Sequence, residues 1–191
     1  MRPYLSVDLE TTGLDMKSAI LEIAFVLDDG KSPVDQLEKH SYVIQHNSFT
    51  HAEPYALNMN AALIKQIAEK KDTVSLEFAL KQLEIALTDL SYKCQKYDEE
   101  TKAWRIDRKV CIAGKNVASF DIPLLRANGF TSSLISHRTI DTGSMYFKDF
   151  GGVIPSQGEI NKLIGREEVS HRALDDAMDV VCAIRAKLLS A

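Results

Sequence analysis

Cysteine is scarce in this chain. The sequence of 191 residues contains three cysteines, Cys94, Cys111 and Cys182. They are too few and too scattered for a disulfide framework or a structural zinc site. Their scarcity excludes the small disulfide-stapled secreted proteins and fits a reducing compartment such as the cytoplasm.

Long hydrophobic runs are also absent. No run approaches the roughly 20 apolar residues that a membrane-spanning helix needs. The first three residues lead directly into a strand-like segment at residues 4–7, without the apolar core or cleavage site of a signal peptide. We therefore expect a cytoplasmic protein that has no membrane partner.

The third absence is an excess of positive charge. The chain has 23 lysines and arginines against 27 aspartates and glutamates, which gives a formal net charge of -4. A protein that grips a long duplex through its backbone usually carries a basic surface. A nucleic-acid partner would therefore need metal ions to supply positive charge at the site. Single-stranded ends or short oligonucleotides are favoured over long duplexes.

The remaining composition is that of an ordinary globular protein, with 45% hydrophobic and 26% charged residues. A chain of this length can bury its own core, and we expect one domain over residues 1–191. Apolar patterns and turn signals predict strands at residues 4–9, 20–27, 41–45, 110–113 and 139–141. Helical spacing predicts helices at residues 60–70, 75–90, 119–127, 157–164 and 172–189.

The order of these elements predicts the fold class. Three closely spaced strands indicate an antiparallel meander, and strands that alternate with helices follow it. Charged alternation over residues 93–108 predicts a small hairpin that projects from the body. The sequence therefore predicts an α/β protein with a mixed sheet flanked by helices.

Asp8 and Glu10 stand at the end of the first predicted strand, in the segment DLETTG. Alternate side chains of a strand share a face, so the two carboxylates point the same way. They repel each other unless a cation lies between them, and Mg²⁺ or Mn²⁺ prefers such oxygen ligands. The pair alone is weak evidence, because Asp-x-Glu usually marks a solvated strand edge. The Thr-Thr-Gly that follows offers hydroxyl and amide groups that can hold a terminal sugar.

Other candidates lie far along the chain. Asp121 follows Phe120 at the start of a predicted helix, where an acid commonly complements the helix dipole. On the last predicted helix, Asp176 lies about 110° and Asp175 about 150° from the centre of the apolar stripe. We therefore expect Asp176 to border the core and Asp175 to face water. Taken singly, each acid has an ordinary structural explanation, as does His171 in a loop before the helix.

Together and in this order, these residues resemble the DEDDh exonucleases, a DnaQ-like 3′→5′ exonuclease family of the ribonuclease H-like superfamily. Asp8 and Glu10 match its first motif, Asp121 the second, and His171 followed five residues later by Asp176 the third. The histidine separates the chain from the sister group, which has tyrosine near that position. The resemblance implies a mixed five-stranded sheet, with strands 1–3 antiparallel and strands 4–5 parallel.

The resemblance also implies a mechanism with two divalent metal ions, Mg²⁺ or Mn²⁺. In that mechanism Asp8 bridges both ions, Glu10 and Asp176 complete the ligands of one, and Asp121 supports the other. His171 is the general base that takes a proton from the attacking water. The implied reaction is hydrolysis of phosphodiester bonds from the 3′ end of single-stranded nucleic acid, with DNA expected ahead of RNA.

The expected substrate contacts flank these acids or precede the helix predicted from residue 60. They are Thr11, Thr12, Gly13, Leu14, Asn58, Met59 and Phe120. Backbone groups of Thr11 and Thr12 are expected to meet the terminal nucleotide. The side chains of Leu14 and Phe120 are suited to stack against a base, and packing in the core explains them equally well.

Other functions stay open at this point. One is an exoribonuclease that matures or degrades RNA, since ribose and deoxyribose differ by one hydroxyl. Another is a proofreading subunit bound to a polymerase, or a homodimer, which co-purification would reveal. The last is a catalytically idle nucleic-acid-binding module on the same fold. The presence of four mutually repelling carboxylates argues against an idle site.

Overall fold

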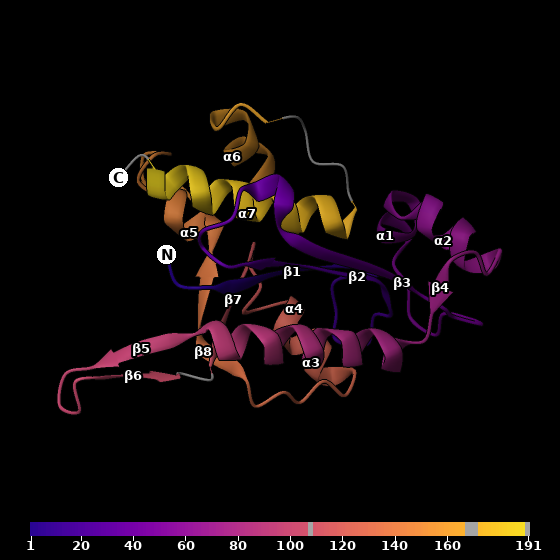
Figure 1. Cartoon of the computed structure of the whole chain (residues 1–191). Helices are drawn as coiled ribbons and strands as arrows, with labels where there is room; N and C mark the ends of the chain where they lie inside the picture. The colour runs from indigo at the N-terminus through magenta and orange to yellow at the C-terminus, as the bar shows by residue number, and fades with distance from the viewer. Residues whose placement is uncertain (107–108, 167–171, 190–191) are drawn as a thin grey trace.

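A computed structural model describes residues 1–106, 109–166 and 172–189 of the chain. Its main feature is a six-stranded sheet with the strand order β4-β3-β2-β1-β7-β8 (Figure 1). The strands are β1 (Tyr4–Thr11), β2 (Ile20–Asp28), β3 (Glu38–Ile44), β4 (Thr73–Val74), β7 (Val110–Gly114) and β8 (Ile135–Asp141). The long central strands β1 and β2 are buried over nearly their whole length, as their apolar sequences require.

The strand directions confirm the predicted mixed sheet. β1, β2 and β3 are antiparallel neighbours, whereas β7 runs parallel to β1 and β8 runs parallel to β7. The structure has one strand more than expected, because β4 adds a parallel pairing of two residues at the edge beside β3. A segment this short has no periodicity that a sequence pattern can reveal.

Helices cover both faces of the sheet (Figure 1). They are α1 (Pro54–Met59), α2 (Ala61–Ala68), α3 (Leu76–Lys93), α4 (Asp121–Ala127), α5 (Thr142–Tyr146), α6 (Gln157–Leu163) and α7 (Ala173–Leu189). One core cluster joins α3 and α4 to one face of β1 and β2. A second joins α7 to the opposite face of β1, β2 and β7. The sheet is therefore the middle of three layers.

Several helix boundaries differ from the predictions. The helix expected from residue 119 begins at Asp121, because residues 116–120 form the turn that precedes it. The short helices α1 and α5 were not predicted. Pro54 stands at the first position of α1, where a proline is well tolerated, but α1 buries none of its residues and so lacks an apolar stripe. Asn58 and Met59 consequently lie in a helix and not at a loop-to-helix junction.

The predicted hairpin near residues 93–108 is present. β5 (Gln95–Asp98) and β6 (Ala103–Ile106) form a separate two-stranded antiparallel sheet. It continues from the end of α3 and projects from the body of the protein (Figure 1). The carboxylate of Asp98 accepts hydrogen bonds from the amides of Glu100 and Thr101, which closes the turn.

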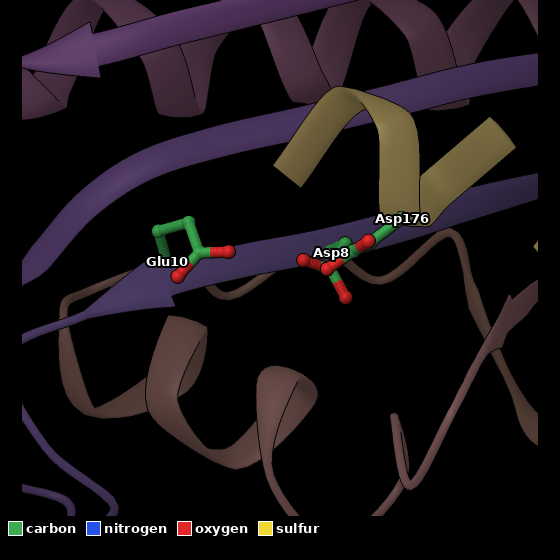
Figure 2. Close-up of side chains that lie close together, drawn as sticks. All are labelled: Asp8, Glu10 and Asp176. Carbon is green, nitrogen blue, oxygen red and sulfur yellow. The ribbon is translucent and has the colours of Figure 1, made fainter. Parts of the chain in front are cut away.

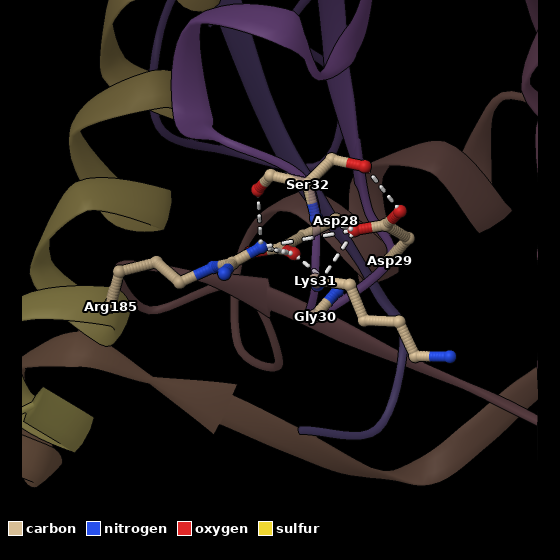
Figure 3. Close-up of polar contacts among 6 residues, drawn as sticks. All are labelled: Asp28, Asp29, Gly30, Lys31, Ser32 and Arg185. Atoms are coloured by element: carbon tan, nitrogen blue, oxygen red, sulfur yellow. Dashed lines mark hydrogen bonds and ion pairs between the residues drawn. The ribbon is translucent and has the colours of Figure 1, made fainter.

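Two arginines tie α7 to strand β2. Near the end of the helix, Arg185 bonds to Asp28, whose side chain is fully buried (Figure 3). Its Nε atom lies 2.8 Å from Asp28 Oδ2, and Nη2 also donates to the carbonyl of Ser32. Near the start of the helix, Arg172 forms a similar pair with Glu22. A bidentate arginine–carboxylate pair fixes direction as well as distance, so the two pairs set how α7 lies on the sheet.

No helix in the described part of the chain is long and apolar enough to cross a membrane.

The pair at the end of α7 gives a stability prediction. Replacing Arg185 with Met leaves the buried Asp28 carboxylate without its cation, and breaking a buried pair in this way typically costs about 3 kcal/mol. We expect urea denaturation of Arg185→Met to show a loss of this size. The double variant Asp28→Asn/Arg185→Met should recover most of it. A loss below about 1 kcal/mol, the range of surface pairs, would contradict a structural role.

Candidate active site

The alternation of side chains along β1 decides which residues enter the site. Leu5, Val7 and Leu9 point into the core beneath α3 and α4. Ser6 and Asp8 therefore face the other way, toward α7. The Ser6 hydroxyl donates a 2.8 Å hydrogen bond to the carbonyl of Ala177 on that helix. Asp8 is two residues further along the same face.

Three carboxylates meet where β1 passes under the first turn of α7. Asp8, Glu10 and Asp176 each have one carboxylate oxygen within 4.8 Å of the others. Figure 2 shows Asp176 reaching from α7 toward Asp8, with Glu10 next along β1. In the part of the chain that the structure describes, no other three acids, histidines or cysteines come this close. The sequence places Asp8 and Asp176 168 positions apart, and the fold brings them together.

Asp121 belongs to α4, which packs against the face of the sheet opposite to that of α7. It is the first residue of α4 and is 4% exposed. The backbone amides of Leu9 and of Asp121 itself act to lower the pKa of its carboxyl, against the larger effect of burial. The charge of Asp121 also raises the pKa of Asp8. All four acids that the sequence singled out are therefore electrostatically coupled in one site.

Burial and mutual repulsion raise the pKa of every acid in the site. Burial is the largest cause in each case. The pKa of Asp8 lies well above its usual value, and those of Glu10, Asp121 and Asp176 rise to about 7. The charges of the neighbouring acids add to the shift at each residue. A cation bound among these oxygens would offset the repulsion and stabilise the charged form of each carboxyl.

The donor set fits a hard divalent cation. All the converging ligands are carboxylate oxygens, which Mg²⁺ and Mn²⁺ prefer. One carboxylate oxygen of the same residues, Asp176 Oδ1, is buried without a hydrogen-bond partner. Buried polar atoms are rarely left unpaired, and a missing ion is one of the usual reasons. The residues present thus suit a metal ion held by Asp8, Glu10 and Asp176.

The burial of α7 agrees with the helical pattern of its sequence. Asp175 is exposed and Asp176 is half-buried, as their angles from the apolar stripe predict. His171, the expected general base, lies outside the described residues, and its role stays a prediction.

An apolar cavity of about 190 Å³ opens beside Glu10. Its lining includes Gly13, Leu14, Met59 and Phe120 among the predicted substrate contacts. Leu14 is 75% exposed, so packing in the core does not explain its side chain. Phe120 is partly buried and also packs against the core. Asn58 is exposed and does not line the cavity.

Thr11 and Thr12 are engaged within the loop after β1. The Thr11 hydroxyl donates to the carbonyl of Gly13, and the Thr12 hydroxyl donates to the carbonyl of His51. The backbone amide of Thr12 donates to the carbonyl of Ala19. These bonds hold the loop in place at the edge of the cavity, which Thr11 also lines.

Sequence reasoning missed four residues of the cavity that come from α1 and its flanks, namely Glu53, Tyr55, Ala56 and Asn60. Tyr55 is 75% exposed at the cavity, and Glu53 accepts a hydrogen bond from the amide of Leu14. Asn60 is buried, and its amide group donates to the carbonyl of Thr11 and lowers the pKa of Glu10. The available signal was Pro54, which favours a helix start and hence an ordered Tyr55 beside it.

Comparisons with known proteins identify the fold. No family model matches the chain, and no curated protein sequence matches it. Among solved structures, the cell-death related nuclease CRN-4 superimposes with a TM-score of 0.68 at 12% identity, over 100% of this chain and 65% of that one. A zinc-bound complex of E. coli exonuclease I with single-stranded DNA gives a TM-score of 0.66 at 15% identity, over 100% and 41%.

Exonuclease X in complex with 5′ overhanging duplex DNA is nearer in length. It superimposes with a TM-score of 0.60 at 17% identity, over 98% of this chain and 92% of that one. By contrast, the chain spans less than two thirds of CRN-4 and less than half of exonuclease I. At such low identities the likeness concerns the fold. The chain therefore shares the fold of these nucleases, an α/β architecture with a mixed sheet flanked by helices, as the sequence predicted.

Proposed function

We propose that this chain is a metal-dependent 3′→5′ exonuclease that acts on single-stranded nucleic acid. The observation that carries the proposal is the convergence of Asp8, Glu10 and Asp176 on one point, in a fold shared with known exonucleases. The DNA in the structures of exonuclease I and exonuclease X favours DNA as the substrate class. The net charge of -4 favours a short contact with a strand end.

The carboxylates have two tasks in this proposal. Asp8, Glu10 and Asp176 would hold one divalent cation, and Asp8 with Asp121 would hold a second. When bound, the ions supply Lewis acidity, which activates the attacking water and stabilises charge on the leaving 3′ oxygen. The acids would fix where those ions lie, since β1, α4 and α7 are held in place by their buried residues.

His171 is the proposed general base. A histidine with an ordinary pKa near 6.5 can accept a proton from water at neutral pH and release it to solvent afterwards. The assignment rests on the sequence, in which His171 precedes Asp176 by five residues.

The apolar cavity beside Glu10 would hold the terminal base. Leu14 and Tyr55 offer exposed apolar surface there, and Phe120 and Met59 line the same cavity. A base can stack on such side chains whatever its identity, because every base has a flat π face. The volume is smaller than the roughly 300–1,000 Å³ of pockets for drug-sized ligands, which suits one base and not a base pair.

The proposed activity predicts a metal-dependent ladder of products. End-labelled single-stranded DNA and RNA of matched sequence should shorten from the 3′ end with Mg²⁺ or Mn²⁺ and stay intact with EDTA. Asp8→Asn should reduce the rate at least about 10³-fold, since metal ions contribute several kcal/mol to the transition state. No cleavage of either strand by the wild type, matching Asp8→Asn, would move the assignment to an idle binding module or to an enzyme that needs a partner.

Variants of His171 and Asp8 should differ in whether they lose metal affinity together with the rate of cleavage. His171→Ala is expected to lower kcat by about 10²–10⁴-fold, the usual contribution of a general base, while its calorimetric affinity for Mn²⁺ stays that of the wild type. Asp8→Asn should lose both. An unchanged kcat in His171→Ala would remove the histidine from the mechanism.

The raised pKa values predict how stability depends on pH without metal. An ordinary unfolded carboxyl has a pKa near 4, whereas Glu10, Asp121 and Asp176 titrate at about 7 in the folded protein. Between these values the folded state binds more protons than the unfolded state, so stability falls as pH rises from about 4 to 7. Asp8→Asn removes one repelling charge, and in EDTA it should gain stability over the wild type across this range.

Thermal unfolding in EDTA at pH 5 and pH 7.5 measures the effect. We expect the Tm of Asp8→Asn to exceed that of the wild type by about 2–4 °C or more beyond the difference at pH 5 when both are measured at pH 7.5. This increase corresponds to roughly 1 kcal/mol in a domain of this size. Added Mn²⁺ should raise the Tm of the wild type at pH 7.5 and leave that of Asp8→Asn nearly unchanged. A pH-independent difference would show that the pKa of Asp8 is not raised in the folded protein.

Tyr55 tests the base cavity. Tyr55→Ala removes a stacking surface worth about 1–3 kcal/mol and should raise KM for a short oligonucleotide roughly 10-fold with little change in Tm, because the side chain is exposed. Tyr92→Ala is the matched control, since Tyr92 is 59% exposed on α3 and does not line the cavity. If both variants keep the KM of the wild type, the base does not bind at Tyr55.

A further inference from the structure

Glu22 is a fully buried acid next to the carboxylate site that does not join it. It lies on β2 directly opposite Glu10 of β1. Its charge contributes to the raised pKa of Asp8, Glu10 and Asp176, so it lies within electrostatic range of all three. Yet Glu22 is not among the acids whose oxygens converge. Its own hydrogen bonds explain why.

Both carboxylate oxygens of Glu22 are occupied by other partners. Arg172 Nε lies 3.1 Å from Oε2, and Arg172 Nη2 lies 3.0 Å from Oε1. The hydroxyl of Ser41 donates to Oε1 at 2.5 Å, and the amide of Ala173 donates to Oε2 at 3.3 Å. Four donors from two chain segments thus converge on one buried carboxylate. Arginine presents two of them in a rigid fork, which a lysine does not have.

These bonds fix the first turn of α7. Arg172 immediately precedes the helix, and the amide of Ala173, its first residue, also points at Glu22. The carbonyl of Arg172 accepts a 3.1 Å hydrogen bond from the amide of Asp176. A shift of Arg172 relative to β2 would therefore move the helical turn that carries Asp176. Strand β2 is in turn hydrogen-bonded to β1, which carries Asp8 and Glu10.

We propose that Arg172 and Glu22 form a positioning pair that holds Asp176 at the site where it shares one divalent cation with Asp8 and Glu10. The inference rests on the proposed function, because it assigns a role toward the metal ion of that site. Arg172 touches neither the cation nor the substrate in this role. It acts through the main chain of α7, and its partner is the buried acid of the neighbouring strand.

The direction of the change in Mn²⁺ affinity distinguishes a positioning role of Arg172 from a direct effect of its charge. Arg172 is a cation near the site, and its charge lowers the pKa of Glu10. Removing it would, by charge alone, strengthen the attraction of the site for Mn²⁺. If Arg172 instead positions Asp176, its removal weakens Mn²⁺ binding. Changes in residues that orient metal ligands typically reduce metal affinity 10–100-fold. Weaker Mn²⁺ binding after removal of a positive charge is thus the signature of positioning.

The same helix provides a matched control. Arg185 forms a bidentate pair with the fully buried Asp28 of β2 near the other end of α7 (Figure 3). Arg185→Met and Arg172→Met therefore break the same kind of bond between the same two elements. Only the second lies at the turn that carries Asp176. A general loss of helix docking would affect both variants alike.

The experiment is calorimetric titration of the full chain with Mn²⁺ at pH 7.5, accompanied by thermal unfolding with and without Mn²⁺. Arg172→Met should bind Mn²⁺ about 10–100-fold more weakly than the wild type, and Arg185→Met should bind it with unchanged affinity. The double variant Glu22→Gln/Arg172→Met leaves no unpaired buried charge and should fold with nearly wild-type stability. We expect its Mn²⁺ affinity to remain weak.

Three outcomes would overturn the inference. Tighter Mn²⁺ binding by Arg172→Met would show that the arginine acts through its charge. Equal weakening in Arg172→Met and Arg185→Met would show a general docking effect. Wild-type affinity in the stable double variant would make the pair purely structural. In each case the wild type still binds Mn²⁺ and shortens DNA, so the proposed function stands; if the wild type binds no Mn²⁺, both fail.

Discussion

The crowding of four carboxylates at one point is the constraint on which this structure depends. Asp8, Glu10, Asp121 and Asp176 come from β1, α4 and α7, and burial together with mutual repulsion raises the pKa of each. Such a cluster opposes folding unless other interactions hold its members in place. The sheet supplies them, because each acid is attached to an element whose apolar side is buried in one of two core clusters.

The two faces of β1 have separate tasks in that arrangement. Leu5, Val7 and Leu9 anchor the strand to the layer of α3 and α4, whereas Ser6 bonds to the main chain of α7. Asp8 shares the face of Ser6 and so meets α7 one residue away from Ala177, at Asp176. Because side chains alternate along a strand, β1 places Asp8 next to α7 without needing a dedicated loop. This explains why the two acids need only a regular strand and a regular helix.

This regularity also decides what the sequence reveals. The alternation of side chains along a strand predicts that Asp8 and Glu10 point to the same face of the sheet. The angle of Asp176 from the apolar stripe of its helix predicts that its side chain is half-buried. Only the resemblance to a family, with its motifs in order, predicted that these acids meet, because no local sequence pattern connects residues so far apart. Tyr55 escaped prediction because α1 buries nothing, and hence has no stripe. The two-residue strand β4 is below the length at which alternation can be recognised.

The arginines on and near the last two helices bear on how an acidic chain would bind a phosphate. Arg166, Arg172 and Arg185, on or next to the last two helices, are each bonded to a buried acid: Asp179, Glu22 and Asp28 respectively. Their charges are therefore committed to carboxylates inside the protein and not to a ligand. In the proposed function, the attraction of the site for a phosphate would then come largely from the cations that the converging acids would hold. The low positive charge of the sequence and the geometry of the site lead to the same requirement.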